Sequence, residues 1–498
     1  MRTDYKYFYG KMCRFVLRNR KNIFNVKVKK NHDSKKTCFW ITPWLGTPVP
    51  FYAFALALLL RIYKRDEIIL VFNDLMGESK LYPSYKDATV YLKKLSKMAS
   101  LINSIKIIRL SETGSNELTD EENTMLEYMA RQNAIKYLHC SEENNKYKSI
   151  CREWYKELKT PAERIKSILT NHLIDCVVLP GGIFQETGII VRMCERLGID
   201  YYTYDCDVNN ILTSVNGIAS QKRDVQKIYK DIIENGRGDS FLRKSLEVME
   251  NRKNARKEKD GQEFQICPYH ETGKIKHDIT IFANIEDDTA ALGTHIFYES
   301  DSQWLERTID FIINETDYTI ALREHPMLRM GGNERALQQI KVKYNNCERF
   351  RFISCREEVN SYQLINESGV IIVNTSTIGL ESAMMGKRIV TESESYYSDA
   401  SFVTKCYTEK EYFDSLIKEV ERKKALSPEE IKEASIYYGL AQLCSGGKSY
   451  FTTQNKDFDV WIKKDFKSIV NNGETKLYIK SLLEKKALAK IKYEKQYK

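Results

Sequence analysis

The stretch NESGVIIVNTSTIGLESAMMGKRIVT, residues 366–391, decides the fold of this chain. Its apolar β-branched run, Val370 to Val373, is typical of a strand that is buried on both faces of a parallel sheet. The next four residues, 374–377 (NTST), are all of types that favour the start of a helix. The stretch therefore predicts a strand, a hydroxyl-rich turn and a helix in succession, as in α/β proteins.

The predicted turn has the composition of an anion-binding site. Free N–H groups and the positive dipole end of a helix attract phosphate, and α/β proteins bind ligands beyond the carboxyl ends of their strands. Thr375, Ser376 and Thr377 add hydroxyl groups at this place. Glu381, about one turn into the helix, is a candidate to accept hydrogen bonds from a ribose. The alternative is a capped helix that binds nothing.

A second strand pattern, Tyr318 to Leu322, leads into Arg323, Glu324, His325 and Pro326. Proline ends the strand pattern, so Arg323 and His325 are predicted on the ligand-facing edge of the same sheet. An arginine offers a permanent fork of donors, and a histidine offers a neutral or charged one. The two side chains suit a diphosphate or a nucleotide phosphate. The alternative for His325 is a purely structural role.

Seven segments follow one another in a recognisable order. They are LPGGIFQETGIIVRMCERLGIDYYTYD (179–205), LTSVNGIA (212–219), FANIEDDTAALG (282–293), SQWLERTIDFI (302–312), LREHP (322–326), VNTSTIGLESAMMGKRIVT (373–391) and SYYSDASFVTKCYTEKEYF (395–413). This order resembles the capsular polysaccharide biosynthesis family of bacterial glycosyltransferases, relatives of the capsule Kdo transferases with a GT-B architecture. The resemblance covers roughly residues 170–415. More distantly, the His-Pro pair and the hydroxyl turn are similar to sialyltransferase-like and teichoic-acid polymerase-like enzymes with CMP- or CDP-linked donors.

The predicted fold class is α/β, with two Rossmann-like domains that face each other across a cleft. The 498 residues are too many for one ordinary core. We predict five parts in chain order. They are a basic extension (1–36), an N-terminal acceptor domain (37–220) with a helical insertion at about 112–170, a charged helical connection (221–275), a C-terminal nucleotide-sugar donor domain (276–455) and a basic helical tail (456–498).

The net charge of +10 is concentrated at the two ends of the chain. Between Arg2 and Lys36, twelve Lys and Arg residues stand against two Asp. Such blocks are typical of solvated tails. The alternative is attraction to an anionic membrane surface, with interleaved aromatic residues as interfacial anchors. These residues are Tyr5, Tyr7, Phe8, Tyr9, Phe15 and Phe24.

The cell compartment is predicted from three further features of the sequence. The most apolar run, Phe51 to Leu60, is about half the length that a bilayer requires. Twelve scattered cysteines without paired spacing favour a reducing compartment. The sequence also bears on possible partners, because no zinc-finger or RNA-binding signature is present, and nucleic acid is therefore not a predicted partner. We expect a cytoplasmic protein, peripheral at the inner face of the plasma membrane.

The resemblance implies that the donor nucleotide lies against the C-terminal domain. Thr375, Ser376 and Thr377 would bind phosphate, and Glu381 would contact the ribose. Asn284 ends a strand at the same edge, and Arg323 and His325 would neutralise the departing nucleotide, so no metal ion and no cofactor is required. The predicted nucleotide contacts are therefore Asn284, Arg323, His325, Thr375, Ser376, Thr377 and Glu381.

Candidates for the acid or base are less specific. His325 is one, as a group beside the departing nucleotide. An inverting transfer needs a carboxylate or a histidine near the acceptor hydroxyl, and Glu186 and Asp205, or Asp207, are candidates on the cleft side. Each of these three has a capping or surface role as its alternative, and a retaining enzyme needs no such base.

The predicted function is glycosyl transfer in bacterial capsule or surface polysaccharide synthesis. The donor is a nucleotide sugar, a CMP-linked acidic sugar such as Kdo or sialic acid, and the acceptor is a polysaccharide or a lipid-linked glycan. Three alternatives stay open. They are a CDP-glycerol-type glycerophosphotransferase, a GT-B-fold sugar-nucleotide epimerase and a non-catalytic capsule assembly protein.

Overall fold

The short apolar runs of the first half of the chain form a mainly parallel sheet of order β13-β6-β5-β4-β1-β2-β3. β6 and β13 are its antiparallel members. Its strands are β1 (Lys36–Ile41), β2 (Glu67–Phe72), β3 (Ile105–Arg109), β4 (Cys176–Pro180), β5 (Asp200–Asp207), β6 (Asn210–Val215) and β13 (Gly446–Lys448). This computed structural model describes residues 5–24, 35–44, 46–63, 67–140, 144–207, 210–235, 238–254, 265, 267–270, 274–330 and 335–497.

Helices cover both faces of this sheet because its central strands are apolar on both sides. One face carries α1 (Tyr5–Arg18), α2 (Arg20–Phe24), α3 (Val49–Tyr63), α4 (Tyr85–Ala99), α16 (Asn455–Trp461), α17 (Phe466–Val470) and α18 (Gly473–Glu484). The other carries α5 (Asp120–Leu138), α6 (Tyr147–Asn171) and α7 (Gln185–Leu197). The predicted helical insertion is therefore the crossover between β3 and β4, and it forms a layer of the domain.

The second domain has a six-stranded, fully parallel sheet of order β12-β11-β10-β7-β8-β9. Its strands are β7 (His277–Phe282), β8 (Ile320–Arg323), β9 (Phe350–Ile353), β10 (Ser368–Val373), β11 (Arg388–Thr391) and β12 (Val403–Lys405). On one face lie α10 (Asp301–Glu315), α11 (Arg335–Lys343) and α14 (Glu409–Arg422). On the other lie α8 (Asp224–Glu234), α9 (Asp239–Lys253), α12 (Ser361–Asn366), α13 (Ile378–Met384) and α15 (Pro428–Leu443).

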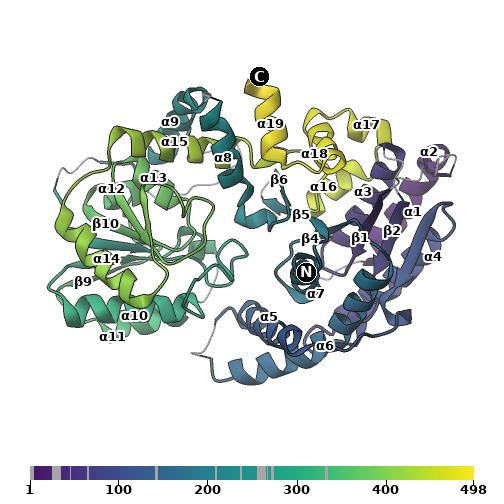
Figure 1. Ribbon diagram of the computed structural model, residues 1–498, viewed down its shortest axis with the longest axis horizontal. Helices are drawn as coiled ribbons and strands as arrows, with labels where there is room; N and C mark the ends of the chain where they lie inside the picture. Colours follow the sequence, from purple (N-terminus) through teal and green to yellow (C-terminus); the bar gives the residue numbers. More distant parts are fainter. Residues whose placement is uncertain are drawn as a thin grey trace.

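Figure 1 shows the two sheets side by side, each between its helices. The predicted fold class is confirmed, because the protein is α/β with two Rossmann-like domains, as in GT-B architectures. The predicted connection differs, since α8 and α9 pack in the helical layer of the second domain. Residues 255–264 of that connection lie outside the described part of the chain.

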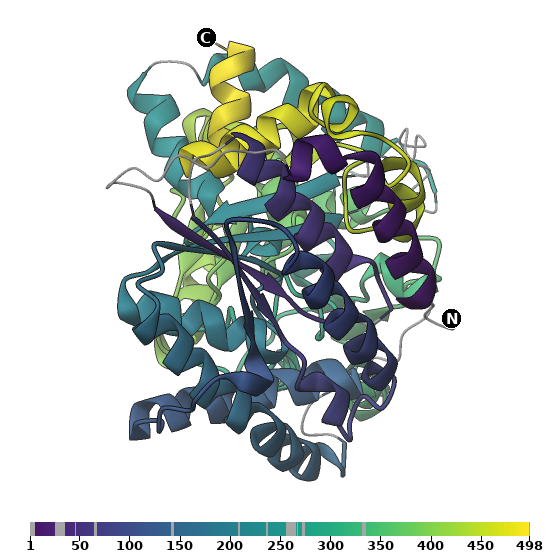
Figure 2. The same ribbon diagram turned by 90° about the vertical axis from the view of Figure 1, so that its right-hand side faces the viewer.

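The chain returns to the first domain after α15. Residues 446–448, predicted within the C-terminal domain, form β13 and pair with β6. From there α16 to α18 follow, and then α19 (Leu488–Tyr497). Helices α16 to α18 of the predicted basic tail are thus part of the first domain, as the yellow helices beside the purple N-terminal ones show (Figure 2). The last helix, α19, packs instead in the core of the second domain, and its Lys490 lies 2.6 Å from Asp231 of α8.

The N-terminal helices bury several of the aromatic residues considered as membrane anchors, whereas Tyr7 and Phe24 are exposed. Phe15 is fully buried, with ring centroids 5.7 Å from Trp461 and 5.2 Å from Phe466. Phe8 lies 5.1 Å from Phe458 in the same way. An amphipathic helix buries its apolar face, and this face lies on protein. No helix in the described part of the chain combines the length and the apolar character needed to cross a bilayer.

Candidate functional site

The carboxyl ends of β7, β8 and β10 border a cavity of about 270 Å³, here called the donor cavity. The register aligns these ends, because Phe282 pairs with both Val373 and Arg323. The first domain contributes Ser220 and Lys222 to the rim. All seven residues predicted to contact the nucleotide line this cavity, namely Asn284, Arg323, His325, Thr375, Ser376, Thr377 and Glu381.

The hydroxyl turn after β10 keeps hydroxyl groups available to a ligand. Thr377 precedes α13 with helical angles (φ −56°, ψ −24°) and makes no side-chain capping hydrogen bond, because such a cap needs extended backbone. The predicted capping role is therefore absent. Asn284 donates to Thr375 Oγ1 at 2.9 Å. The Ser376 hydroxyl makes no hydrogen bond within the described part of the chain.

His325 presents a neutral imidazole to the donor cavity. Its Nδ1 accepts from the Met327 backbone N–H at 3.2 Å, so the proton of the neutral ring resides on Nε2. Burial lowers the pKa of His325, which keeps the ring neutral near pH 7. Nε2 meets no hydrogen-bond partner among the described residues. The Nε2–H group of His325 is thus a donor that none of the described residues uses.

Arg323 lines the donor cavity, but two of its guanidinium nitrogens bind backbone carbonyls, and its contact with a nucleotide stays a prediction. Its guanidinium is 3% exposed and donates to Ser354 O at 2.5 Å and to Val359 O at 3.1 Å. Because buried donors need partners, these groups hold the loop after β9 instead of forming a free fork for phosphate. Burial also lowers the pKa of Arg323.

Glu381 is bound to an arginine that the sequence reasoning missed. Its Oε1 accepts from Arg252 at 3.2 Å and from the Tyr438 hydroxyl at 3.2 Å. Burial raises the pKa of Glu381, and Arg252 opposes that rise. Arg252 lies on α9 and also lines the donor cavity. In the sequence, no local pattern distinguishes Arg252 from the charged residues that surround it.

The candidate bases of the first domain lie away from the donor cavity. Glu186 is fully buried, and its Oε1 accepts from Trp40 Nε1 at 3.1 Å and from the Thr42 hydroxyl. Asp205 accepts from its neighbour's backbone N–H at 2.7 Å on β5. The side chain of Asp207 lies outside the described part. The catalytic roles of Glu186 and Asp205 stay predictions.

The acidic run after Asn284 connects the two domains. Asp287 binds Lys136 of α5 and His139, the residue that follows α5, each at 2.9 Å, and these two contacts lower the pKa of Asp287 against the effect of burial. Asp288, by contrast, lines the donor cavity. The loop after β7 therefore both borders the donor cavity and holds the domains together.

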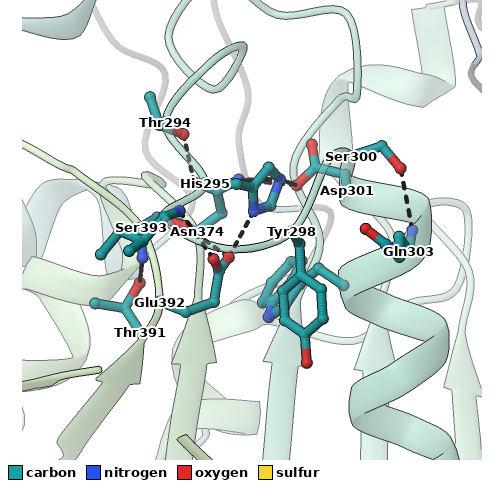
Figure 3. Close-up of polar contacts among 12 residues, drawn as sticks. Thr294, His295, Tyr298, Ser300, Asp301, Gln303, Asn374, Thr391, Glu392 and Ser393 are labelled. Carbon is teal, nitrogen blue, oxygen red and sulfur yellow. Dashed lines mark hydrogen bonds and ion pairs between the residues drawn. The ribbon is translucent and has the colours of Figure 1, made fainter. Parts of the chain in front are cut away.

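A buried charged cluster, which no sequence pattern indicated, lies beside the hydroxyl turn (Figure 3). His295 Nδ1 is 2.5 Å from Glu392 Oε1, and His295 Nε2 is 3.2 Å from Asp301 Oδ1. Burial by itself lowers the pKa of His295, but Glu392 and Asp301 raise it to about 10. The ring is therefore a buried cation at neutral pH.

This cluster holds Asn374, the first residue of the hydroxyl turn. Asn374 Nδ2 donates to Asp301 Oδ1 at 2.8 Å, and the Thr294 hydroxyl donates to Asn374 Oδ1 at 2.9 Å (Figure 3). Both contacts come from the segment that also carries His295. The turn that borders the donor cavity is thus fixed from behind by a network with buried charges.

Comparison with known protein families finds a match to most of the second domain. Residues 242–411 match the family described as capsule polysaccharide biosynthesis protein, which confirms the predicted family resemblance over about a third of the chain. The matched segment contains Arg252, His295, His325 and the hydroxyl turn. A comparison with curated protein sequences finds no match to the chain.

Solved structures of low sequence identity are also similar to the chain. The KpsC β-Kdo 2,7-transferase of Thermosulfurimonas dismutans shares 15% identity at a TM-score of 0.31, over 55% of this chain and 79% of that one. The KpsC β-Kdo 2,4-transferase of the same organism shares 12% identity at a TM-score of 0.35, over 58% and 88%. The UDP-GlcNAc 2-epimerase of Methanocaldococcus jannaschii shares 11% identity at a TM-score of 0.23, over 78% and 92%.

Proposed function

We propose that the protein is a GT-B glycosyltransferase of capsule or surface polysaccharide synthesis, with a CMP-linked acidic sugar as its donor. The observation that carries the proposal is the donor cavity, in which a free hydroxyl, a neutral imidazole N–H and Arg252 border one space. Nucleotide ligands of α/β proteins bind at such an edge. The family match over the same residues supports a role in capsule synthesis.

In the proposed reaction, the bond between the sugar and the nucleotide phosphate breaks, and negative charge grows on the departing phosphate. The Nε2–H of His325 and the hydroxyl of Ser376 donate to that charge. Preorganised donors of this kind are each worth about 2.7–4 kcal/mol in other enzymes. Arg252, held against Glu381, adds a fixed positive charge to the cavity. The proposal assigns the phosphate charge to these groups and therefore requires no metal ion.

A thermal-shift panel of CMP, CDP, UMP, UDP and GDP tests the proposal. A ligand that binds only the folded protein stabilises it by about 2.7 kcal/mol at a concentration one hundred times its Kd. For a domain of this size, that stabilisation raises the melting temperature by roughly 5–11 °C. We expect CMP to give the largest shift, His325→Ala to reduce it strongly, and His270→Ala, an exposed histidine outside the cavity, to leave it unchanged.

The panel also separates the alternatives. A preference for CDP would favour glycerophosphate transfer, and a preference for UDP would favour epimerase-like chemistry. No shift with any nucleotide would overturn the proposal and favour a non-catalytic assembly role. A shift that His325→Ala retains in full would contradict the placement of the phosphate.

A further inference from the structure

A second cavity, of about 130 Å³, lies between the two domains. Its walls come from α5, α7 and the β5–β6 hairpin of the first domain and from Leu292 and Gly293 of the second. Gly293 has a positive φ of 72°, and a Cβ atom there would be 2.6 Å from the Tyr128 hydroxyl. Glycine therefore permits the close approach of the two domains at this place.

Two buried polar groups of this cavity have no partner among the described residues. Gln132 is only 5% exposed, and its side chain makes no hydrogen bond there. The Nε–H of Arg223 is buried and likewise unpaired, although the same guanidinium donates to Glu394 O at 3.2 Å. Buried polar groups are paired in the large majority of cases. An unpaired acceptor and an unpaired donor beside one small cavity therefore indicate a ligand that can both donate and accept hydrogen bonds.

The charges around the cavity favour an anionic ligand. Arg131, Arg192 and Arg223 act on Tyr128 and lower its pKa, although burial has the larger effect and raises it. The acid in the cavity wall, Glu195, is already bound by Arg192 at 3.4 Å and by the Tyr201 hydroxyl at 2.8 Å. The acidic partner of Arg131, Glu299, is 3.9 Å from it. Cationic groups therefore predominate at the Tyr128 side of the cavity.

One short segment forms a wall of both cavities. Ser220 and Lys222 line the donor cavity, whereas Gln221 and Arg223 line the second one. Lys222 has a left-handed backbone (φ 54°), which turns the chain between the two cavities. A ligand in the second cavity thus lies directly behind the rim of the donor cavity.

We propose that the second cavity binds one sugar residue that carries a carboxylate, as a subsite for the glycan acceptor. The carboxylate would accept from the Nε–H of Arg223 and from Arg192, and a ring hydroxyl would donate to Gln132 Oε1. The volume of the second cavity is smaller than that of sites for drug-sized ligands, and it suits a ligand of one sugar ring. The assignment of the sugar to the acceptor rests on the proposed transferase function, whereas the binding itself does not.

Saturation-transfer NMR on the full chain tests the inference, with millimolar glucuronate and N-acetylneuraminate as acidic probes and glucose as the neutral one. No nucleotide is added, so the result is independent of the donor panel. We expect signals from an acidic probe with wild type, a several-fold loss with Gln132→Leu, and full signals with His325→Ala. Gln303→Leu, which changes a glutamine outside both cavities, serves as the matched control.

Four outcomes would overturn the inference. They are no signal from any probe, an equal signal from glucose, a signal that Gln132→Leu retains, and a signal that His325→Ala abolishes, since the last would place the probe in the donor cavity. Misfolding is checked by the melting temperature. Because the Gln132 amide has no partner among the residues that the structure describes, its replacement by leucine is expected to leave that temperature unchanged or raise it.

Discussion

Replacement of His295 by glutamine removes the cation between two buried carboxylates. Glu392 is 1% and Asp301 is 6% exposed, so neither carboxylate gains solvent in exchange. Loss of one partner of a buried ion pair costs about 3–5 kcal/mol, because it leaves an uncompensated buried charge. The pKa of His295 gives a consistent figure. A rise from 6.5 to about 10 corresponds to about 5 kcal/mol of stabilisation.

The sign of the pH dependence follows from the raised pKa of His295. Below pH 6.5 the histidine is protonated in both the folded and the unfolded protein, and its stabilisation is fully present. Between pH 6.5 and about 10 only the folded protein holds the proton, so the stabilisation falls by roughly 1.4 kcal/mol per pH unit. The difference in stability between wild type and His295→Gln should therefore shrink by about 2–3 kcal/mol from pH 7 to pH 9.

The assay is the thermal unfolding of the full chain by calorimetry at pH 7, 8 and 9. A loss of about 3–5 kcal/mol lowers the midpoint of a domain of this size by roughly 6–20 °C at pH 7. His277→Gln is the matched control, since burial lowers the pKa of His277 and its contribution cannot decline at alkaline pH. A loss below about 1 kcal/mol at pH 7, or a difference that stays constant to pH 9, would refute the reasoning.

Three further predictions follow from the packing and the donor cavity. Arg252→Met should destabilise the protein by about 3–5 kcal/mol because it leaves Glu381 buried without its cation, and the double variant Arg252→Met/Glu381→Met should recover most of the loss in calorimetry. Phe15→Ala should cost about 3–5 kcal/mol in thermal unfolding, whereas Leu17→Ala, at a position 63% exposed, should stay within about 0.5 kcal/mol. Because the pKa of His325 is below its ordinary value, the affinity for CMP should be unaffected by this group from pH 7 to 8.5 and should rise below pH 6 relative to His325→Gln, as titration calorimetry can measure.

Local patterns were sufficient to predict the part of the fold that borders the donor cavity. The run at 366–391 predicted a strand, a turn and a helix, and the structure has β10, the hydroxyl turn and α13 there. The strand before Arg323 was predicted in the same way. These elements are recognisable because burial on both faces of a parallel sheet requires a short apolar run, whatever the rest of the chain does.

Contacts between distant residues explain what the sequence could not predict. Glu381 was expected to be free for a ribose, but its partner Arg252 stands 129 residues earlier. The buried charged cluster joins two distant parts of the chain, because His295 and Asp301 lie near the start of α10, whereas Glu392 follows β11, 97 residues after His295. The aromatic face of α1 has the same sequence pattern whether protein or membrane covers it. Only the fold shows that Trp461 packs against this face.

The return of the chain through β13 determines the order in which the molecule can be completed during synthesis. The second domain, residues 224–443, lies as a continuous piece between two parts of the first one. Its sheet has all its strands as soon as β12 has been made. The first sheet cannot be completed before β13 has been synthesised, and the core around Phe15 cannot be completed before Trp461 has been synthesised. On the ribosome, the domain that begins the chain is therefore the last to be finished, and a chain that stops at residue 443 would leave the apolar faces of α1 and α3 uncovered.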